Sequence, residues 1–209
     1  MKKIVSMLLS VVMLCSVTAG LNLTAYAAET GDWSDTIKYS YDEDTCELTL
    51  SGQGVLTYSD SFRENFSEKD VRSIVIQEGI TSISNGVFAC EDDSFYGDLQ
   101  SVTLPKGLLS IGNYAFSYCT SLSSIIIPNS VTTIGDYAFD WCWLDEITLS
   151  DGLVTIGEGA FEGCSLTKVN IPKTVKKIGD NAFSGDFLSV VITQDRKSTR
   201  LNSSHITIS

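Results

Sequence analysis

A pattern of about 22 residues recurs between positions 99 and 187, and it constrains the fold more than any other feature of the chain. Four full copies follow one another, and a looser copy opens the series at position 71. Repeats of this length stack into a solenoid, because one copy alone buries too little apolar surface to offset the entropy of ordering its backbone. The copies read LQSVTLPKGLLSIGNYAFSYCTS (99–121), LSSIIIPNSVTTIGDYAFDWCW (122–143), LDEITLSDGLVTIGEGAFEGCS (144–165) and LTKVNIPKTVKKIGDNAFSGDF (166–187).

The spacing within a copy predicts strands joined by turns. Ile125 and Ile127 stand two residues apart, which is strand periodicity with one buried face. Proline follows this strand in most copies and ends it, because proline donates no ladder hydrogen bond. The glycine of each I-G pair predicts either a positive φ or a close backbone approach, and the next segment, G-x-x-A-F, predicts one helical turn. We expect one buried aromatic column along the axis: Phe88, Phe116, Phe139, Phe161 and Phe183.

The shared pattern L-x-x-[IV]-x-[IL]-P-x-x-[VL]-x-x-I-G-x-x-A-F-x-x-C resembles the BspA-like leucine-rich repeats of bacterial surface and secreted proteins. The resemblance covers residues 71–192, and the I-P, I-G and A-F pairs recur at fixed offsets. Departures from the pattern are local: Asp186 replaces the cysteine, Ser150 the proline and Ser84 the glycine, and residues 91–98 are an insertion after the opening copy. The resemblance implies a mainly β fold with short helical turns, a leucine-rich repeat solenoid with an N-terminal β cap.

The two ends of the chain differ from the repeats. Residues 1–27 have the features of an export signal, with Lys2 and Lys3 before an apolar run that is shorter than the roughly 18 residues a membrane span needs. Residues 28–70 predict a β-hairpin cap, with strands at 37–41, 48–50 and 55–58 and a brief helix at 61–70. Residues 71–194 form the solenoid, which we expect to be truncated at its C-terminus.

Residues 195–209 follow no repeat logic and match the translation of a common sequencing-library adapter. We therefore expect this tail to be non-native and exclude it from fold reasoning.

The composition excludes several classes of function. The only histidine, His205, lies in the adapter-like tail, which leaves no Ser-His-Asp or Cys-His nucleophile and no histidine metal site. Residues 28–194 hold 9 basic and 25 acidic side chains, a balance of −16 in a chain of net charge −12, which argues against nucleic acid and anionic lipid. Asp42, Asp44 and Glu47 lack the glycine and the distal glutamate of an EF-hand loop and predict a polar turn. We expect no enzyme activity, no cofactor and no metal.

Five cysteines remain after the export signal. Cys119, Cys142 and Cys164 share one repeat position, so their side chains stack at the strand spacing of about 4.8 Å, whereas bridged Cβ atoms lie about 3.8 Å apart. We expect these three to be buried free thiols. A bridge between Cys46 and Cys90 is left open.

Two surfaces are candidate ligand-binding sites. If the leucine and the fourth and sixth positions of each copy point inward, the third and fifth positions form an exposed strip on the sheet. A second candidate is a set of aromatic side chains in adjacent copies, which would stack on sugars, anchor a protein, or simply pack at the outer edge. The strip holds Ser124, Ile126, Glu146, Thr148, Lys168 and Asn170; the aromatic set holds Tyr118, Trp141 and Trp143, with Tyr114 and Tyr137 in another shared position.

These features favour a secreted or cell-surface binding module for an extracellular protein or glycan, acting in adhesion or recognition without catalysis. Two alternatives stay open: an accessory repeat region of a larger exported enzyme whose catalytic domain lies elsewhere, and a structural spacer. The sequence does not determine the ligand, the mode of attachment to the cell or the oligomeric state.

Overall fold

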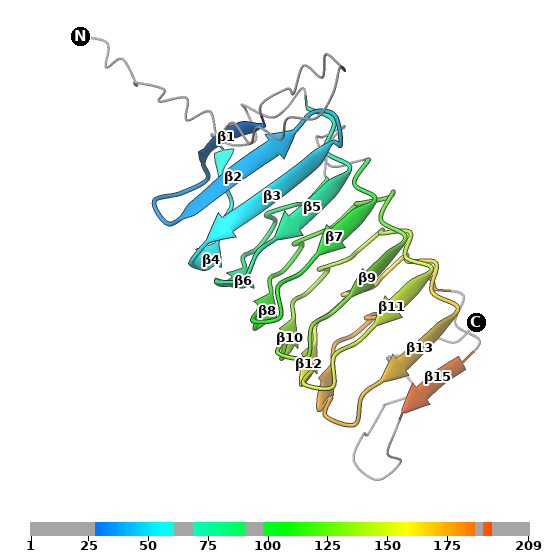
Figure 1. Cartoon of the computed structure of the whole chain (residues 1–209). Coiled ribbons are helices and arrows are strands. Elements are labelled where there is room, and N and C mark those ends of the chain that lie inside the picture. Colours follow the sequence, from blue (N-terminus) through cyan, green and yellow to red (C-terminus); the bar gives the residue numbers. More distant parts are fainter. Residues whose placement is uncertain (1–27, 61–68, 91–97, 187–189, 194–209) are drawn as a thin grey trace, which may run out of the picture.

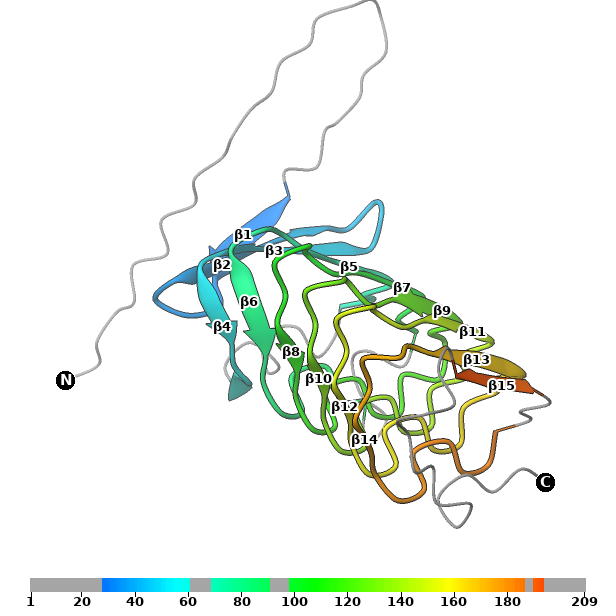
Figure 2. The same cartoon turned by 90° about the horizontal axis from the view of Figure 1, so that it is seen from below.

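The computed structural model describes residues 28–60, 69–90, 98–186 and 190–193, and the chain winds through them as a solenoid built from β-strands and turns (Figures 1 and 2). The predicted fold class is confirmed. The predicted export signal, residues 61–68 of the helix expected at 61–70, and the adapter-like tail lie outside the described residues; residues 69–70 are not helical.

Each copy contributes a longer strand and then a shorter one, as the two apolar segments of the pattern predict. The longer strands are β5 (Ser73–Ile76), β7 (Ser101–Thr103), β9 (Ser124–Ile126), β11 (Glu146–Thr148), β13 (Lys168–Ile171) and β15 (Val190–Thr193). The shorter strands are β6 (Ile80–Ile83), β8 (Ser110–Ile111), β10 (Thr133–Ile134), β12 (Thr155–Ile156) and β14 (Lys177–Ile178).

The two kinds of strand form two sides of the coil, and these sides differ in continuity (Figure 2). The shorter strands make one unbroken parallel sheet in the order β14-β12-β10-β8-β6-β4, where β4 spans Gly54–Leu56. The longer strands are divided into a sheet ending at β7, the pair β9–β11 and the pair β13–β15. Within the described residues, no strand ladder joins β7 to β9 or β11 to β13.

The third side of the coil consists of turns, and the predicted helical turn is wrong. Alternate N–H groups of each A-F segment donate to the next copy, as when the Phe116 N–H donates to the Ala138 carbonyl at 2.8 Å and the Phe139 N–H to the Ala160 carbonyl at 2.9 Å. The N–H groups between them close single turns within the copy, as when the Glu162 N–H donates to the Gly159 carbonyl at 2.9 Å. These single turns do not continue as a helix, because the intervening N–H groups bond to the next copy and because residues such as Tyr114 and Tyr118 have left-handed backbone conformations. The turns therefore continue the ladder between copies.

The glycine of the I-G pair is required for close approach and not for a positive φ. A Cβ on Gly112 would lie 2.6 Å from the Ser84 carbonyl carbon, and one on Gly157 would lie 2.5 Å from the Asp136 nitrogen. Any side chain at these positions would force neighbouring copies apart.

The core is a single column of apolar side chains that runs the length of the solenoid. The expected phenylalanine column is confirmed: the five rings are essentially inaccessible, and successive centroids lie 5.2, 5.3, 5.4 and 5.3 Å apart. Trp33 covers the first ring, with its centroid 6.1 Å from that of Phe88, and its indole N–H donates to the Thr57 carbonyl at 2.8 Å. The N-terminal segment thus shields the first copy of the core from water.

That segment is a three-stranded meander joined to the repeats. Strands β2 (Ile37–Asp42) and β3 (Glu47–Gly52) form the predicted hairpin, and β3 pairs in parallel with β5. Strand β1 (Glu29–Asp32), which the sequence pattern did not indicate, pairs antiparallel with β2.

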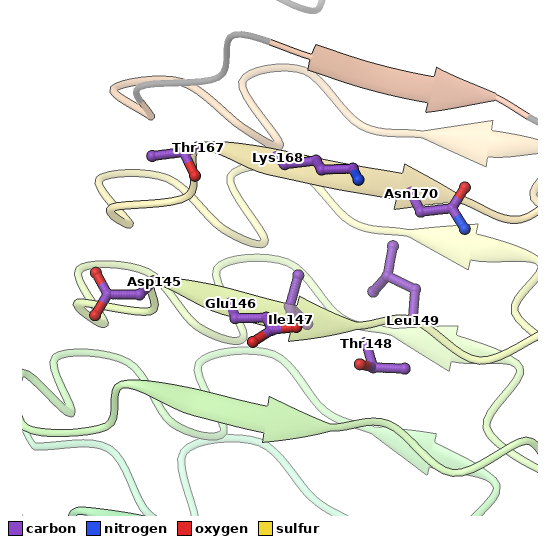
Figure 3. A pocket seen from close by; sticks show the side chains of 8 residues that line it. All are labelled: Asp145, Glu146, Ile147, Thr148, Leu149, Thr167, Lys168 and Asn170. Carbon is purple, nitrogen blue, oxygen red and sulfur yellow. The ribbon is translucent and has the colours of Figure 1, made fainter.

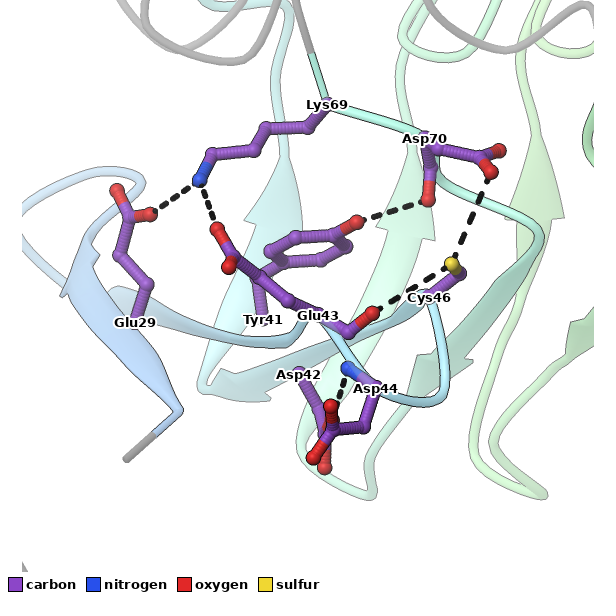
Figure 4. Close-up of polar contacts among 8 residues, drawn as sticks. All are labelled: Glu29, Tyr41, Asp42, Glu43, Asp44, Cys46, Lys69 and Asp70. Atoms are coloured by element: carbon purple, nitrogen blue, oxygen red, sulfur yellow. Dashed lines mark hydrogen bonds and ion pairs between the residues drawn. The ribbon is translucent and has the colours of Figure 1, made fainter. Parts of the chain in front are cut away.

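Polar contacts hold the meander to the chain that enters the first repeat (Figure 4). The Lys69 ammonium lies 3.0 Å from a Glu29 oxygen and 2.5 Å from a Glu43 oxygen. The Tyr41 hydroxyl donates to the Asp70 carbonyl at 2.8 Å, and burial raises the pKa of Tyr41 to about 12. The Asp44 N–H donates to Asp42 Oδ1 at 2.9 Å, which makes this acidic segment the polar turn that was expected.

Within the described residues, the structure contains no helix with the length and hydrophobicity that crossing a membrane requires.

Candidate functional site

The predicted polar strip lies on the outer face of the longer strands. The six strip residues are all exposed, whereas the alternate residues Ile125, Ile147 and Val169 are buried. Parallel pairing of β9 with β11 sets Ser124 beside Glu146 and Ile126 beside Thr148. Ile126 is 72% exposed, the most exposed large apolar side chain of the described residues.

A groove of about 500 Å³ lies on this face where the ladder between β11 and β13 is interrupted (Figure 3). Its lining comes from the two strands and the residues next to their ends: Asp145, Glu146, Ile147, Thr148, Leu149, Thr167, Lys168 and Asn170. Four of the six strip residues thus gather around one groove, and Ser124 and Ile126 extend the surface on β9.

The groove carries charges of both signs. Glu146 and Lys168 occupy equivalent positions on β11 and β13, and no ion pair joins them among the described residues. Their charges, with the amide of Asn170 and the hydroxyl of Thr148, are therefore directed to solvent and to anything that binds here. Hydrogen bonds and ion pairs at such a partly enclosed surface give orientation and specificity more than raw affinity.

The aromatic set lies on the turn side that leads into these strands. Tyr118 stacks on Trp141, with ring centroids 6.4 Å apart and planes 7° apart, and Tyr114 stacks on Tyr137 at 5.2 Å and 10°. Tyr114, Tyr118 and Trp141 are 42%, 43% and 50% exposed, and Trp143 is 59% exposed without a stacking partner in the described part of the chain. The sequence analysis placed these aromatics in shared positions of adjacent copies and left open whether they bind a ligand or pack at the outer edge; their stacking on one another was not predicted.

The four stacked aromatics adopt left-handed backbone conformations. Their φ values are 56° for Tyr114, 62° for Tyr118, 54° for Tyr137 and 53° for Trp141. Other copies carry glycine or asparagine in the same two columns, at Gly86, Gly159, Asn181, Gly163 and Gly185. A bulky residue in this region is an outlier that costs about 1–3 kcal/mol, so these two copies tolerate strain to present aromatic rings.

The aromatic stacks end on glycines of the next copy. A Cβ on Gly163 would lie 3.2 Å from the Trp141 indole, and a Cβ on Gly159 would overlap the Tyr137 ring. The Tyr137 hydroxyl donates to Glu158 at 2.8 Å, which raises the pKa of Tyr137 to about 12. Ring stacking, glycine contact and this hydrogen bond fix the rings in place.

The structure therefore brings the candidate residues together as two separate surfaces, the strip with its groove and the aromatic turns. Asp145 and Thr167, in the second position of their copies, also line the groove and were missed. Both are polar residues at the second position of a copy, directly before the outward-facing third position, and this pattern could have indicated them. The left-handed columns were also missed, although glycine and asparagine in the same columns of other copies indicate them.

Metal-ligating side chains do not gather on either surface among the described residues. The described residues contain no cluster of three or more histidine, cysteine, aspartate or glutamate side chains placed to hold a metal ion. What the two surfaces offer is an array of hydrogen-bonding groups, charges and aromatic rings, which is the chemistry of recognition.

Solved bacterial leucine-rich repeat proteins share this fold. A leucine-rich repeat protein from Eubacterium ventriosum is 24% identical, with a TM-score of 0.66, over 81% of this chain and 45% of that one. The T. pallidum leucine rich repeat protein TpLRR is 24% identical, with a TM-score of 0.55, over 76% of this chain and 69% of that one. The pneumococcal vaccine antigen PcpA is 20% identical, with a TM-score of 0.55, over 78% of this chain and 50% of that one.

The chain thus spans less than half of the Eubacterium protein and half of PcpA. No curated protein matches the sequence. The family described as "BspA type Leucine rich repeat region (6 copies)" matches residues 60–189. Because this match takes in more than half of the chain, and the coil, the core column and the solved relatives agree with it, the protein belongs to the BspA-type leucine-rich repeat family.

Proposed function

We propose that this protein is a secreted or cell-surface binding module and that the strip of β9, β11 and β13 is its contact surface for an extracellular protein. The observation that carries the proposal is the groove of about 500 Å³ with an unpaired glutamate and lysine on facing strands. The family consists of bacterial surface-type proteins, and PcpA is named as a vaccine antigen, which supports an exposed location.

The expected contact is shallow and spread over several copies. Ile126 supplies an apolar contact that is already open to solvent, and Glu146 and Lys168 orient a partner that carries both charges. The excess of acidic residues favours partners with basic segments over nucleic acid or anionic lipid. The aromatic turns provide a second contact area, suited to a glycan or to an aromatic protein interface.

The test is an array of purified extracellular matrix proteins and free glycans probed with the full chain. We expect retention of at least one protein and a loss of at least tenfold in affinity in the Glu146→Lys, Lys168→Glu double variant, which keeps the net charge. The matched control is Asp151→Lys with Lys176→Glu, two exposed residues outside the groove, which should leave binding unchanged.

Other results would change the conclusion. Retention of glycans alone, lost in Trp141→Gly but not in the groove variant, would assign binding to the aromatic turns. No retention of any probe would favour a spacer, or an accessory region of a larger exported enzyme.

A further inference from the structure

We propose that Cys90 and Cys119 form a disulfide when the folded protein meets a small disulfide oxidant, which would fasten the first described copy of the repeat to the second. The structure holds both as free thiols with their Sγ atoms 2.9 Å apart, within about 1 Å of the ~2.05 Å length of an S–S bond. The two residues are 29 positions apart in the sequence.

The other buried cysteines share one repeat position, where the Cys119 thiol also contacts Cys142 but each sulfur is directed at a backbone carbonyl of the preceding copy. Cys142 Sγ donates to the Phe116 carbonyl at 2.9 Å, and Cys164 Sγ donates to the Phe139 carbonyl at 3.2 Å. Cys119 Sγ likewise donates to the Phe88 carbonyl at 3.3 Å, so the thiols at this repeat position all point at backbone oxygens. The expectation of buried free thiols at these three positions is confirmed.

Cys90 stands outside that column. Its N–H donates to the Ser117 carbonyl at 2.8 Å, as the Tyr118 N–H does to the Asp140 carbonyl, which places Cys90 in the column of Tyr118 and one position before that of Cys119. The pair is therefore diagonal: one copy apart along the axis, about 4.8 Å, and one residue apart along the chain, about 3.8 Å. These offsets give a Cα separation of about 6 Å, inside the range for disulfides.

Backbone conformation explains why the sulfur of Cys90 points inward. Tyr118 and Trp141, in the equivalent position, are left-handed and exposed, whereas Cys90 is not among the residues with positive φ and is only 8% exposed. The alternative pairing with Cys46 is not supported, because Cys46 Sγ lies 3.7 Å from the Glu43 carbonyl and 3.8 Å from Asp70 Oδ2 (Figure 4).

The chemistry is thiol–disulfide exchange with a low-molecular-weight disulfide such as oxidised glutathione. The Cys90 thiolate attacks one sulfur of the oxidant, forms a mixed disulfide and releases one thiol. Cys119 then loses its proton and attacks Cys90 Sγ, which forms the internal S–S bond and releases the second thiol. Cys90 makes the first attack because Cys119 is fully inaccessible and burial raises the pKa of its thiol.

The experiment is peptide mapping of the folded, full-length chain after incubation with oxidised glutathione and blocking of free thiols. Digestion with trypsin and chymotrypsin separates Cys90 from Cys119 and cuts between Cys119 and Cys142, because Lys106, Tyr118 and Phe139 provide cleavage sites. We expect a cross-linked peptide that contains Cys90 and Cys119 and disappears on reduction. The melting temperature should rise by up to about 10 °C on oxidation.

Two variants keep the result decisive. Cys119→Ala should leave Cys90 unbridged and remove the thermal shift, and Cys90→Ser, which leaves the Cys119 column intact, should do the same. Cys46→Ala is the matched control and should retain both the cross-link and the shift. Complete alkylation of Cys90 and Cys119 after oxidation, or a cross-link from Cys90 to Cys46 or Cys142, would overturn the proposal. Loss of partner binding in the array above would not bear on it.

Discussion

The molecule contains two kinds of aromatic stack, and they have nearly the same geometry. In the core, Phe116 and Phe139 lie 5.3 Å and 5° apart; on the turns, Tyr114 and Tyr137 lie 5.2 Å and 10° apart. Each stack takes one ring from each copy, so the spacing between copies sets both ring separations. Stacking distance alone therefore does not show whether an aromatic ladder holds a solenoid together.

Burial and backbone conformation separate the two stacks. The phenylalanines are fully buried, with no left-handed φ, whereas Tyr114, Tyr118 and Trp141 are about half exposed and left-handed. The core column contributes stability through apolar burial, about 2 kcal/mol or more per ring. The outer rings gain about 1 kcal/mol from stacking and lose a similar amount to backbone strain. The outer rings therefore add little net stability, in contrast to the core column.

The largest expected effect is at the centre of the core column. Phe139→Ala should lower the free energy of unfolding by about 3–5 kcal/mol, because it leaves a cavity between Phe116 and Phe161. Urea titration followed by circular dichroism measures the change. A loss below about 1 kcal/mol would mean that the column does not bear on stability, and the contrast between the two stacks would fail.

The next effect concerns the glycine under the outer stack. Gly159→Ala places a Cβ against the Tyr137 ring at a φ of 54°, so we expect a loss of about 2 kcal/mol. In a Tyr137→Gly background the ring overlap disappears and the loss should fall to about 1 kcal/mol. The double-mutant cycle measures this coupling. Equal losses in both backgrounds would show that Tyr137 does not rest on Gly159.

The end of the buried column should respond to pH. Asp186 occupies the position held by Cys164 in the preceding copy, and its side chain is buried. Its Oδ1 accepts a hydrogen bond from the Leu166 N–H, and burial raises the pKa of Asp186 to about 8. The folded state therefore keeps a proton that the unfolded chain releases near pH 4. The resulting stabilisation is complete below pH 4 and is lost as the pH rises towards 8.

Melting temperatures measured from pH 5 to 8 check this expectation. They should fall by an amount that corresponds to on the order of 2 kcal/mol in the native protein, and Asp186→Asn should remove this slope. The exposed Asp151→Asn is the control and should leave the slope as it is. A stability that rises over this interval would contradict the buried, protonated carboxyl.

The smallest effect is the most specific to the outer stack. Tyr118→Gly should change the free energy of unfolding by less than about 1 kcal/mol, because lost stacking is offset by relief of the left-handed backbone. Tyr118→Ala loses the ring but keeps the strain, so the glycine variant should be the more stable of the two. At Phe116, which has no left-handed backbone conformation, the alanine variant should be more stable than the glycine variant. A glycine variant of Tyr118 that is less stable than the alanine variant would contradict the strain.

The sequence predicted the features that each copy repeats. Phe139 and Ile125 point inward and Thr148 points outward because a pattern with a fixed period leaves one arrangement that buries every apolar column. Features that depend on the contact between two particular copies were not predicted. The interruption between β11 and β13, the diagonal approach of Cys90 to Cys119 and the cover of Trp33 on Phe88 each depend on how one copy meets a particular neighbour or the N-terminal segment, which the shared pattern does not specify.

The helical turn at A-F was wrong for a related reason. Its local spacing suits a helix, but the backbone groups of Phe116 and Tyr118 are used by the next copy, at 2.8 Å and 2.7 Å. A prediction from one copy cannot show hydrogen bonds that run between copies.

The divided side of the coil has a mechanical consequence. The sheet of shorter strands is continuous from β4 to β14, so stretching it breaks backbone hydrogen bonds, whereas the face of longer strands has two joints without them. We expect the solenoid to bend more easily at β7–β9 and β11–β13 than along the continuous sheet. A partner seated across β11 and β13 would then fix the local curvature at that joint.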